Sequence, residues 1–298
     1  MKRRLQLLLY SMRSQLAHFP GMFALLKIFM LFLPKNLKAN YYGVTMYIDS
    51  RDLRSMKEAF LKSPYENKMH ETFNNVLKAG MSVVDIGAHI GLFSLIAGQK
   101  VGAEGHVYAF EPMPRCYELL QKNIQLYNLN NVEAIQSIVT NKQGKTELWM
   151  DKYYSILGSL HKDNLMNKGE KVEVDAITLD HFFLGTDSHE RRIDIIKMNI
   201  QGAEGLVIDG AKQLLRSKGP TIFMEFWPFG LKKMGSDPEQ LFDTLTGYGY
   251  QVYRIHMDDA SLKPMKKSDI FPLSDFYMKK SVAMYLLWQM PRTNELSL

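Results

Sequence analysis

Apolar and polar positions divide the chain into alternating strand-like and helix-like segments. Short apolar runs predict strands over residues 81–85, 106–110, 132–139, 193–198, 221–226, 251–256 and 282–288. Apolar residues at helical spacing predict helices over residues 52–62, 66–79, 91–99, 114–127, 204–215 and 237–247. This order favours an α/β fold, in which a mostly parallel, doubly wound sheet carries helices on both faces. Residues 145–150 and 171–177 alternate instead like exposed strands.

The first 48 residues have a different pattern. Apolar residues recur at helical spacing between Leu5 and Leu16, and residues 22–33 are apolar except for Lys27. That run is shorter than the roughly 20 apolar residues that span a bilayer, and no small-residue cleavage site follows it, as a signal peptide would require. We therefore expect a basic, apolar helical extension over residues 1–48. It either packs on the body of the protein or, through residues 1–38, lies in the interface of an anionic membrane.

The positive charge of the chain is concentrated in this extension. Of the 37 Lys and Arg residues, seven precede Asp49, the first acidic residue, and the other 30 are balanced by 31 acidic residues. A near-neutral body argues against nucleic acid as a partner, whereas a basic tail favours an anionic surface. The single cysteine, Cys116, excludes an intramolecular disulfide framework. It fits a reducing compartment, so we expect a cytoplasmic protein, peripheral on the membrane if the tail binds there.

The segment VVDIGAHIGLFSLIAG, residues 83–98, joins a predicted strand to a predicted helix through two glycines. Gly87 allows a sharp turn, and Gly91 allows a ligand to approach the backbone where the helix begins. The helix N-terminus offers N–H groups and a partial positive charge to an anion. Asp85 adds a negative charge beside them. The loop therefore suits a zwitterion, with its carboxylate on the amides and its ammonium on Asp85.

A second acidic residue, Glu111, ends the next predicted strand in VYAFEP. A carboxylate at this position can accept hydrogen bonds from both hydroxyls of a ribose. A nicotinamide dinucleotide would need the spacing G-x-G-x-x-G, but this loop reads G-A-H-I-G and has an acid before its first glycine. A nicotinamide oxidoreductase is therefore disfavoured. The two acids together favour an aminoacyl nucleoside, of which S-adenosylmethionine is the common example.

Four segments of the chain occur in an order and spacing that is typical of one enzyme family. They are VVDIGAHIGLFSLIAG, VYAFEPMPRCYELLQKNIQLYNL, IDIIKMNIQGAEGLVIDGAKQLL and PTIFMEFWP. With them the chain resembles the FkbM-type family of class I S-adenosylmethionine-dependent methyltransferases, and a block of type K-x-D-x-E-G-x-E, here Lys197 to Glu204, points to this branch. The resemblance covers residues 70–230 strongly. It implies a methyltransferase domain over residues 49–290, a seven-stranded Rossmann-like sheet whose last strand is antiparallel, and methyl transfer usually to oxygen.

The resemblance also implies that Asp85, Gly87, His89, Gly91 and Glu111 bind the cofactor. The family usually has an asparagine at the position of His89. An imidazole can still donate a hydrogen bond to the cofactor, so we expect binding to survive this difference.

A second departure lies at the end of the fourth strand. The family usually has an aspartate and then a glutamate or glutamine where this chain has Asn199 and Gln201. An asparagine cannot act as a base, and it is a weak ligand for a hard cation. We therefore expect no bound metal and no metal-assisted deprotonation.

A hydroxyl acceptor needs a group that takes its proton. The candidates to take it are Glu225 and Glu204 at strand ends, with His161 or His256 from loops. Asn199, also at a strand end, is a further candidate catalytic residue, but not as the base. We favour Glu225 as the acid of the acceptor side. Glu204 either takes part in catalysis or stabilises the start of a helix.

Three further residues are candidates for substrate binding. Lys197 lies in an apolar strand, where it either extends its ammonium towards solvent or clamps the carboxylates of the cleft. Trp227 and Phe229 follow a predicted strand directly, so they either line the acceptor cleft or pack in the core.

The sequence thus predicts an S-adenosylmethionine-dependent methyltransferase that methylates a hydroxyl. We expect the acceptor to be a saccharide, a glycan or a lipid-linked molecule, because the basic, apolar tail would bring the enzyme to a membrane. The alternative is a cofactor-binding but catalytically inactive scaffold at a membrane, since Asn199 and Gln201 could mark lost chemistry. The sequence leaves the oligomeric state open.

Overall fold

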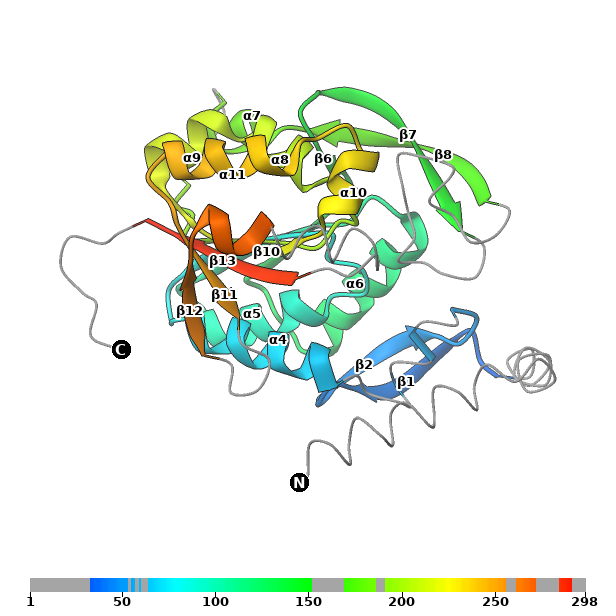
Figure 1. The fold of residues 1–298 in the computed structure, drawn as a ribbon. Helices are drawn as coiled ribbons and strands as arrows, with labels where there is room; N and C mark the ends of the chain where they lie inside the picture. Colours follow the sequence, from blue (N-terminus) through cyan, green and yellow to red (C-terminus); the bar gives the residue numbers. More distant parts are fainter. Residues whose placement is uncertain are drawn as a thin grey trace.

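A central sheet with helices on both faces forms the body of the protein (Figure 1). This computed structural model describes residues 33–52, 55–56, 59, 64–151, 169–185, 191–255, 261–271 and 284–290. The described strands of the central sheet are β3 (Ser82–Ile86), β4 (His106–Phe110), β5 (Val132–Ile135), β9 (Ile195–Met198), β10 (Thr221–Phe226), β11 (Gln251–Ile255), β12 (Leu262–Met265) and β13 (Met284–Gln289).

The order of these strands is β12-β11-β13-β10-β9-β3-β4-β5. From β10 to β5 all neighbours pair in parallel, while β13 runs antiparallel to both β10 and β11. The seven strands from β11 to β5, with β13 reversed, confirm the sheet that the family resemblance implies. β12 adds an edge strand beside β11. The strand order reverses between β3 and β9, and an α/β sheet binds its ligand beyond the carboxyl ends at such a point.

Helices cover both faces of the sheet because strand residues alternate between two apolar cores. Val84 and Met224 pack on one face, and Val83 and Phe223 pack on the other. The helices on the first face are α7 (Leu179–Leu184), α8 (Glu204–Asp209), α9 (Lys212–Lys218), α10 (Pro228–Lys233) and α11 (Pro238–Gly247). Those on the second face are α4 (Pro64–Val76), α5 (Leu92–Val101) and α6 (Pro114–Leu126). The doubly wound fold is therefore confirmed.

Two predicted elements are interrupted in the structure. Residues 132–139 do not form one strand, since β5 ends at Ile135 and β6 (Ile138–Val139) belongs to another sheet. The predicted helix over residues 204–215 is divided at Gly210 into α8 and α9. A Cβ atom on Gly210 would lie 2.2 Å from the carbonyl oxygen of Thr140, and the oxygen of Gly210 accepts a hydrogen bond from the amide of Asp180. The break thus lies where the chain touches two other segments.

The expectation of a helical extension through residue 48 is wrong for its last part. Residues 36–49 form an antiparallel hairpin of β1 (Asn36–Tyr41) and β2 (Val44–Asp49). The side chain of Asn123 on α6 accepts a hydrogen bond from the amide of Tyr47 and donates to the carbonyl oxygens of Tyr47 and Ile90. The hairpin is therefore bound to the body, and the expected boundary at residues 48 and 49 falls inside a strand. Residues 1–32 lie outside the described part of the chain.

A small third sheet lies beside the carboxyl ends of the central strands. It consists of β6, β7 (Gly144–Asp151) and β8 (Gly169–Ile177) in the order β6-β8-β7. The exposed pairs Lys145–Asp175 and Lys171–Glu147 link β7 to β8, which confirms the prediction of exposed strands here.

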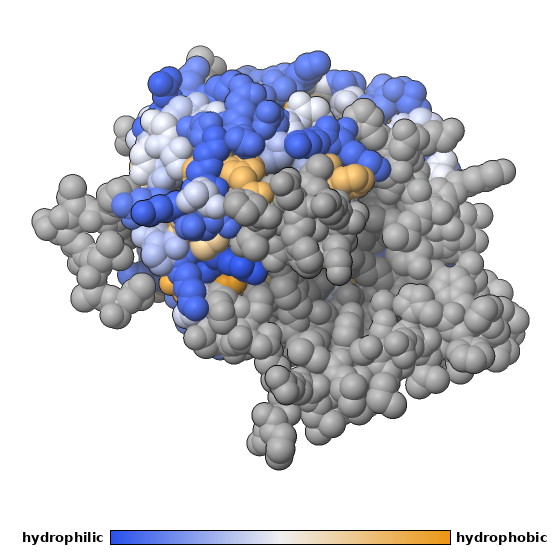
Figure 2. All heavy atoms as spheres, in the orientation of Figure 1, coloured by the Kyte–Doolittle hydropathy of each residue, from blue (hydrophilic) through white to orange (hydrophobic). Residues whose placement is uncertain are grey.

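The described surface is largely polar on the face that Figure 2 presents, with small apolar patches. Leu184 is the large hydrophobic residue exposed in the described part of the chain. Within the same residues, no helix has the length and apolar character that crossing a membrane requires.

Candidate functional site

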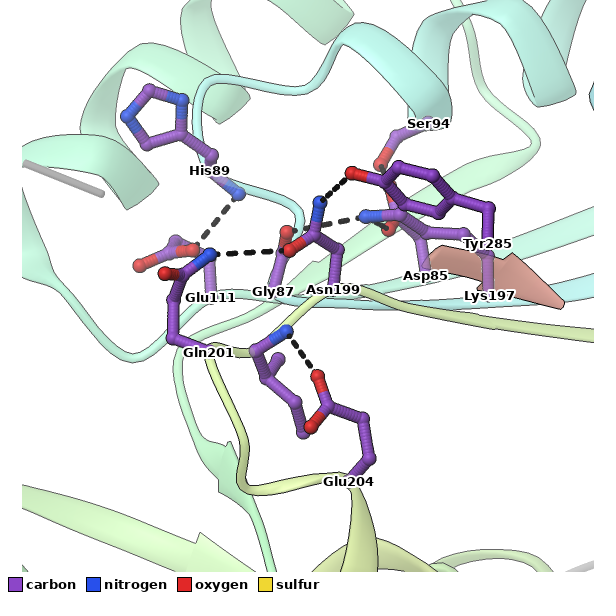
Figure 3. A network of polar contacts seen from close by, with 11 residues as sticks. Asp85, Gly87, His89, Ser94, Glu111, Lys197, Asn199, Gln201, Glu204 and Tyr285 are labelled. Carbon is purple, nitrogen blue, oxygen red and sulfur yellow. Dashed lines mark hydrogen bonds and ion pairs between the residues drawn. The ribbon is translucent and has the colours of Figure 1, made fainter. Parts of the chain in front are cut away.

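An ion pair between Asp85 and Lys197 lies near the carboxyl ends of β3 and β9 (Figure 3). The two residues are register partners on neighbouring parallel strands, and Lys197 Nζ lies 2.8 Å from Asp85 Oδ1. The hydroxyl of Ser94 donates to Asp85 Oδ2 over 2.7 Å. The side chain of Lys197 is 4% exposed and that of Asp85 is 0% exposed. Both charges are thus compensated inside the protein, as buried charges must be.

This pair gives both residues a structural role in addition to the binding roles that the sequence suggests. The ammonium of Lys197 also lies 4.6 Å from the ring centre of Phe93 and 3.4 Å from the carbonyl oxygen of Gly87. Lys197 therefore clamps a carboxylate, as one interpretation expects, and its side chain is buried beneath α5. Its contact with an acceptor stays a prediction. The carboxylate of Asp85 is engaged by Lys197 and Ser94 and is completely buried, so it supports the loop from below. Its contact with the ammonium of the cofactor stays a prediction.

The loop after β3 depends on Gly87. Its φ angle is 72°, and an added Cβ would lie 2.7 Å from Ile200 Cγ2 and 3.0 Å from the carbonyl oxygen of Asn199. The loop therefore touches the segment after β9 at a distance that only glycine permits. Gly91, with a φ of 99°, begins α5, and a Cβ there would lie 2.7 Å from Leu120 on α6. The second glycine thus permits close helix packing, a reason that the sequence did not reveal.

Glu111 fastens this loop to the segment after β4. Its carboxylate accepts hydrogen bonds from the amide of His89 over 2.8 Å and from the amide of Met113 over 2.9 Å. Burial raises the pKa of Glu111 to about 7, although the hydrogen bonds from the two amides act in the opposite direction and lower it. Each carboxylate oxygen has a second lone pair, so Glu111 can accept further hydrogen bonds from a ligand.

A pocket opens beside Glu111 at the carboxyl ends of the central strands. It contains about 720 Å³ of space between atoms, part of it open to solvent. Gly87, His89 and Glu111 line it together with mostly apolar side chains, which include Ile138 and Leu148. These residues fit the adenosyl part of S-adenosylmethionine. Glu111 can accept from ribose hydroxyls, and the apolar wall suits a flat base.

A chain of polar side chains leads away from the same pocket (Figure 3). Gln201 and Asn199 line the pocket, and Gln201 Nε2 donates to Asn199 Oδ1 over 3.3 Å. Asn199 Nδ2 donates to the hydroxyl of Tyr285 over 3.3 Å, and this hydroxyl donates to Glu225 Oε1 over 3.2 Å. The structure thus joins the predicted residues Asn199 and Glu225 through Tyr285. Tyr285 cannot be recognised from the sequence, where its only signal is a polar hydroxyl in an apolar strand.

Glu204 organises the segment that follows β9. Its Oε1 atom accepts from the amide of Ile200 over 3.0 Å, and the amides of Gly202 and Glu204 itself also point to this carboxyl group. Burial, followed by the charge of Glu225, raises the pKa of Glu204 to about 8. Glu204 is completely buried and holds its proton at neutral pH. It supports the loop and a helix start, so its candidate role as a base is not supported by this geometry.

Trp227 and Phe229 lie at the end of β10 and at the start of α10. Their ring centres are 5.6 Å apart, and Lys233 Nζ lies 4.9 Å from the centre of the Phe229 ring. Neither residue lines the pocket beside Glu111, so contact with an acceptor stays a prediction. His161 and His256 lie outside the described residues. Where the chain is described, no group of three His, Cys, Asp or Glu side chains could hold a metal ion.

Comparison with known proteins identifies the family. The chain matches the model of the Methyltransferase FkbM domain over residues 85–252. It is 27% identical over 144 residues to Methyltransferase 1 of Beauveria bassiana (strain ARSEF 2860), with 43% of this chain and 57% of that protein covered. It is 28% identical over 180 residues to Methyltransferase sdnD of Sordaria araneosa, with 50% and 68% covered.

The chain is also similar to a solved structure. Methyltransferase FkbM from Methylobacillus flagellatus KT is 14% identical, with a TM-score of 0.43 over 72% of this chain and 45% of that chain. This chain therefore spans little more than half the length of Methyltransferase 1 and less than half of that solved chain. The family model extends over more than half of the chain, from Asp85 through Glu111 to β11. The protein therefore belongs to the FkbM methyltransferase family, a branch of the S-adenosylmethionine-dependent methyltransferases.

Proposed function

We propose that the protein transfers a methyl group from S-adenosylmethionine to a hydroxyl of its acceptor. The observation that carries this proposal is the link between the pocket at Glu111 and the carboxylate of Glu225, through Asn199 and Tyr285. When bound, S-adenosylmethionine supplies a methyl group that its sulfonium makes electrophilic. The protein then has to hold the cofactor, orient the acceptor and receive the proton of the hydroxyl.

Cofactor binding falls to the residues around the loop after β3. Glu111 would accept from the ribose hydroxyls, while the amides of His89 and Met113 fix its orientation. The first turn of α5 offers backbone N–H groups without intrahelical partners, and these suit the carboxylate of the cofactor. Asp85 and Lys197 hold the loop from beneath. The close approach of Gly87 to Asn199 sets the distance between the loop and the segment after β9.

Glu225 is the proposed destination of the proton. The amides of Asn199 and Gln201 cannot take up a proton at neutral pH. Glu204 already holds its own proton there, because its pKa is raised to about 8. Glu225 is only partly buried, and the hydroxyl of Tyr285 donates to it. This arrangement favours a hydroxyl acceptor, since methylation of oxygen releases a proton and Glu225 is the ionisable group at the end of the hydrogen bonds that lead from the pocket.

Two further features, the aromatic residues after β10 and the basic N-terminus, support a class of acceptor. Trp227 and Phe229 come directly after β10, which carries Glu225, and aromatic rings can pack against the faces of a sugar. The basic, apolar residues at the N-terminus suit an anionic membrane. Together they favour a saccharide, a glycan or a lipid-linked acceptor, methylated at the cytoplasmic face of a membrane.

The membrane proposal has a test of its own. A deletion to residue 38 would cut into β1, so the deletion should end at residue 32. We expect the full chain to sediment with vesicles that contain anionic lipid, and the shortened chain to stay in solution with unchanged affinity for S-adenosylhomocysteine. Sedimentation of both chains would contradict the membrane proposal.

A second candidate function is a scaffold that binds the cofactor but performs no transfer. Asn199 and Gln201 favour it, because the family usually has an acid at the first of these positions. Titration calorimetry with S-adenosylhomocysteine tests the cofactor site, with Glu111→Ala as the variant that should lose binding. Transfer of tritiated methyl groups to polysaccharide and lipid-linked glycan fractions then separates the two functions. The enzyme is supported if the protein binds with micromolar affinity and transfers methyl groups, and if Glu225→Gln abolishes the transfer. Binding without transfer to any fraction supports the scaffold.

A further inference from the structure

Three hydrogen bonds in series connect the pocket to Glu225 on β10. They run from Gln201 to Asn199, from Asn199 to Tyr285, and from Tyr285 to Glu225, over 3.3, 3.3 and 3.2 Å. Figure 3 shows Gln201, Asn199 and Tyr285 in sequence above the strand ends. The series crosses the ends of three neighbouring strands, β9, β10 and β13.

The chemistry of its last member sets the direction of the whole series. An ionised carboxylate only accepts hydrogen bonds, so the hydroxyl of Tyr285 must donate to Glu225. The oxygen of Tyr285 then accepts from the amide nitrogen of Asn199, and the carbonyl oxygen of Asn199 accepts from Gln201. Every donor therefore points towards Glu225. Hydrogen bonds arranged in this way polarise one another and become stronger together.

Tyr285 is held in place by the sheet. It is the register partner of Glu225 on the antiparallel pair of β10 and β13, so both side chains project from the same face. Tyr285 is also buried, with 7% of the residue exposed. The hydroxyl thus has little freedom to turn away from Asn199 or Glu225.

The other end of the series lies in the pocket and is held under strain. Gln201 has a φ of 58°, which is unusual for a residue other than glycine. Gly202 follows with a φ of 98°, and a Cβ there would lie 2.3 Å from the carbonyl carbon of Gly230. The carboxyl group of Glu204 fixes this segment through the amide of Ile200. Backbone strain of this kind persists where the surrounding structure enforces it, often at functional sites.

Gln201 donates one N–H of Nε2 to Asn199, so its Oε1 is the acceptor that remains for a ligand, beside the second N–H of the same nitrogen. Gln201 lines the pocket, and among the described residues Oε1 finds no partner. The pocket therefore contains a fixed hydrogen-bond acceptor next to the segment after β9.

We propose that Tyr285 is a positioning residue, which holds Asn199 and Gln201 so that Gln201 Oε1 faces the pocket and selects an acceptor that carries a hydrogen-bond donor, such as a hydroxyl. This inference rests on the proposed function and deepens it. According to this inference, Tyr285 on the last strand helps to select a hydroxyl without contacting the acceptor itself, because Asn199 and Gln201 lie between them.

Fluorine NMR tests the inference without knowledge of the acceptor. Site-specific 3-fluorotyrosine at position 285 places one probe beside the hydroxyl with little change in volume. We expect its resonance to move when S-adenosylhomocysteine saturates the pocket, and to move again in the Glu225→Gln variant, because the accepting charge is lost. In the Asn199→Leu variant, saturated with S-adenosylhomocysteine, the ligand-induced change should disappear, since the series is interrupted.

Fluorotyrosine at position 253 is the matched control. Tyr253 lies on β11, the other neighbour of β13, and its hydroxyl bonds to Gln251 over 2.8 Å. Its resonance should respond to neither the ligand nor Glu225→Gln. An unchanged resonance at position 285, with normal binding of S-adenosylhomocysteine by calorimetry, would overturn the inference and leave the proposed function standing. Absence of binding to the wild-type protein would instead contradict the proposed function.

Discussion

Asp85 and Lys197 lie opposite each other on the parallel strands β3 and β9, and their charged atoms are 2.8 Å apart in the interior of the protein. The pair joins the two strands between which the sheet order reverses. Since the loop of Gly87 follows β3 and the segment of Asn199 follows β9, one buried interaction sets the position of both walls of the site. We therefore expect the pair to serve both stability and cofactor binding.

Replacement of Lys197 by methionine should destabilise the protein strongly. The variant leaves the carboxylate of Asp85 buried without its partner, and loss of one member of a buried ion pair costs about 3–5 kcal/mol. The double variant Lys197→Met with Asp85→Asn should recover much of this loss, because no unpaired charge remains. Unfolding in urea, followed by circular dichroism, measures the free energies.

Lys145→Met provides the matched control. Lys145 and Asp175 also pair across two strands, over 2.7 Å, but their side chains are 59% and 61% exposed. Exposed pairs of this kind are screened by solvent and contribute little to stability. An equal effect of Lys197→Met and Lys145→Met would contradict the argument that burial makes the first pair important.

Gly87→Ala should damage the site more than the same change at a glycine with similar backbone geometry. Gly87 and Gly80 have φ angles of 72° and 75°, so alanine strains both by about 1–2 kcal/mol. At Gly80 an added Cβ meets nothing within 4 Å, whereas at Gly87 it meets Ile200 and the backbone of Asn199. We expect Gly80→Ala to keep its affinity for S-adenosylhomocysteine and Gly87→Ala to lose at least about tenfold, or 1.4 kcal/mol. Equal affinities by calorimetry would show that the close approach does not shape the site.

The sequence predicts those parts of the fold and site that local patterns encode. The apolar runs at β3, β4, β9 and β10 and the glycine-rich loop were sufficient for the sheet, and Glu111 was found because it directly ends a strand. One interpretation of the sequence has Lys197 clamp a carboxylate of the cleft, but the sequence does not identify Asp85 as that carboxylate and does not point to Ser94. A lysine that is distant in sequence becomes the neighbour of Asp85 only through the pairing of β3 with β9.

The features that the sequence did not predict depend on contacts between distant segments. Tyr285 gains its role by lying opposite Glu225, which follows only from the register of β10 and β13. The hairpin at residues 36–49 depends on Asn123, and the break at Gly210 depends on the approach of Thr140. Propensity and periodicity describe each segment alone, so they cannot reveal such pairs.

Glu111 should make cofactor binding depend on pH near neutrality. Burial raises the pKa of Glu111 to about 7, and hydroxyl donors of a bound ribose favour its ionised form. Affinity for S-adenosylhomocysteine should therefore rise with pH through about 7 and then become constant, with release of protons on binding. Glu111→Gln should lose roughly 10- to 100-fold in affinity, because a hydrogen bond to a charged group is worth about 1.5–3 kcal/mol. It should also lose the pH dependence.

Calorimetry at several pH values, in buffers of different ionisation enthalpy, measures both the affinity and the proton release. Glu118, on the exposed side of α6, supplies the control variant Glu118→Gln, which should behave like the wild type. A Glu111→Gln protein that retained the pH dependence would exclude Glu111 as its origin.

Glu204 should make the stability of the folded protein decrease with pH. Its pKa is raised from 4.5 to about 8 in the folded state by burial and by the charge of Glu225. Below about pH 4.5 both the folded and unfolded states hold the proton, so the stabilising effect is fully present. Between 4.5 and 8 only the unfolded state releases it, which lowers the free energy of unfolding by roughly 1.4 kcal/mol for each unit of difference in pKa. Above about 8 both states are ionised, and the loss is complete.

Glu204→Gln removes this titration and keeps the size of the side chain. The free energy of unfolding of the variant minus that of the wild type should therefore be larger at pH 8 than at pH 5. Urea unfolding across that range measures this difference. The exposed Glu104 provides the control, since Glu104→Gln should shift the stability by a similar amount at every pH. A constant difference between Glu204→Gln and the wild type would mean that Glu204 is ionised in the folded protein. In that case Glu204 would again be a candidate to receive the proton of the acceptor.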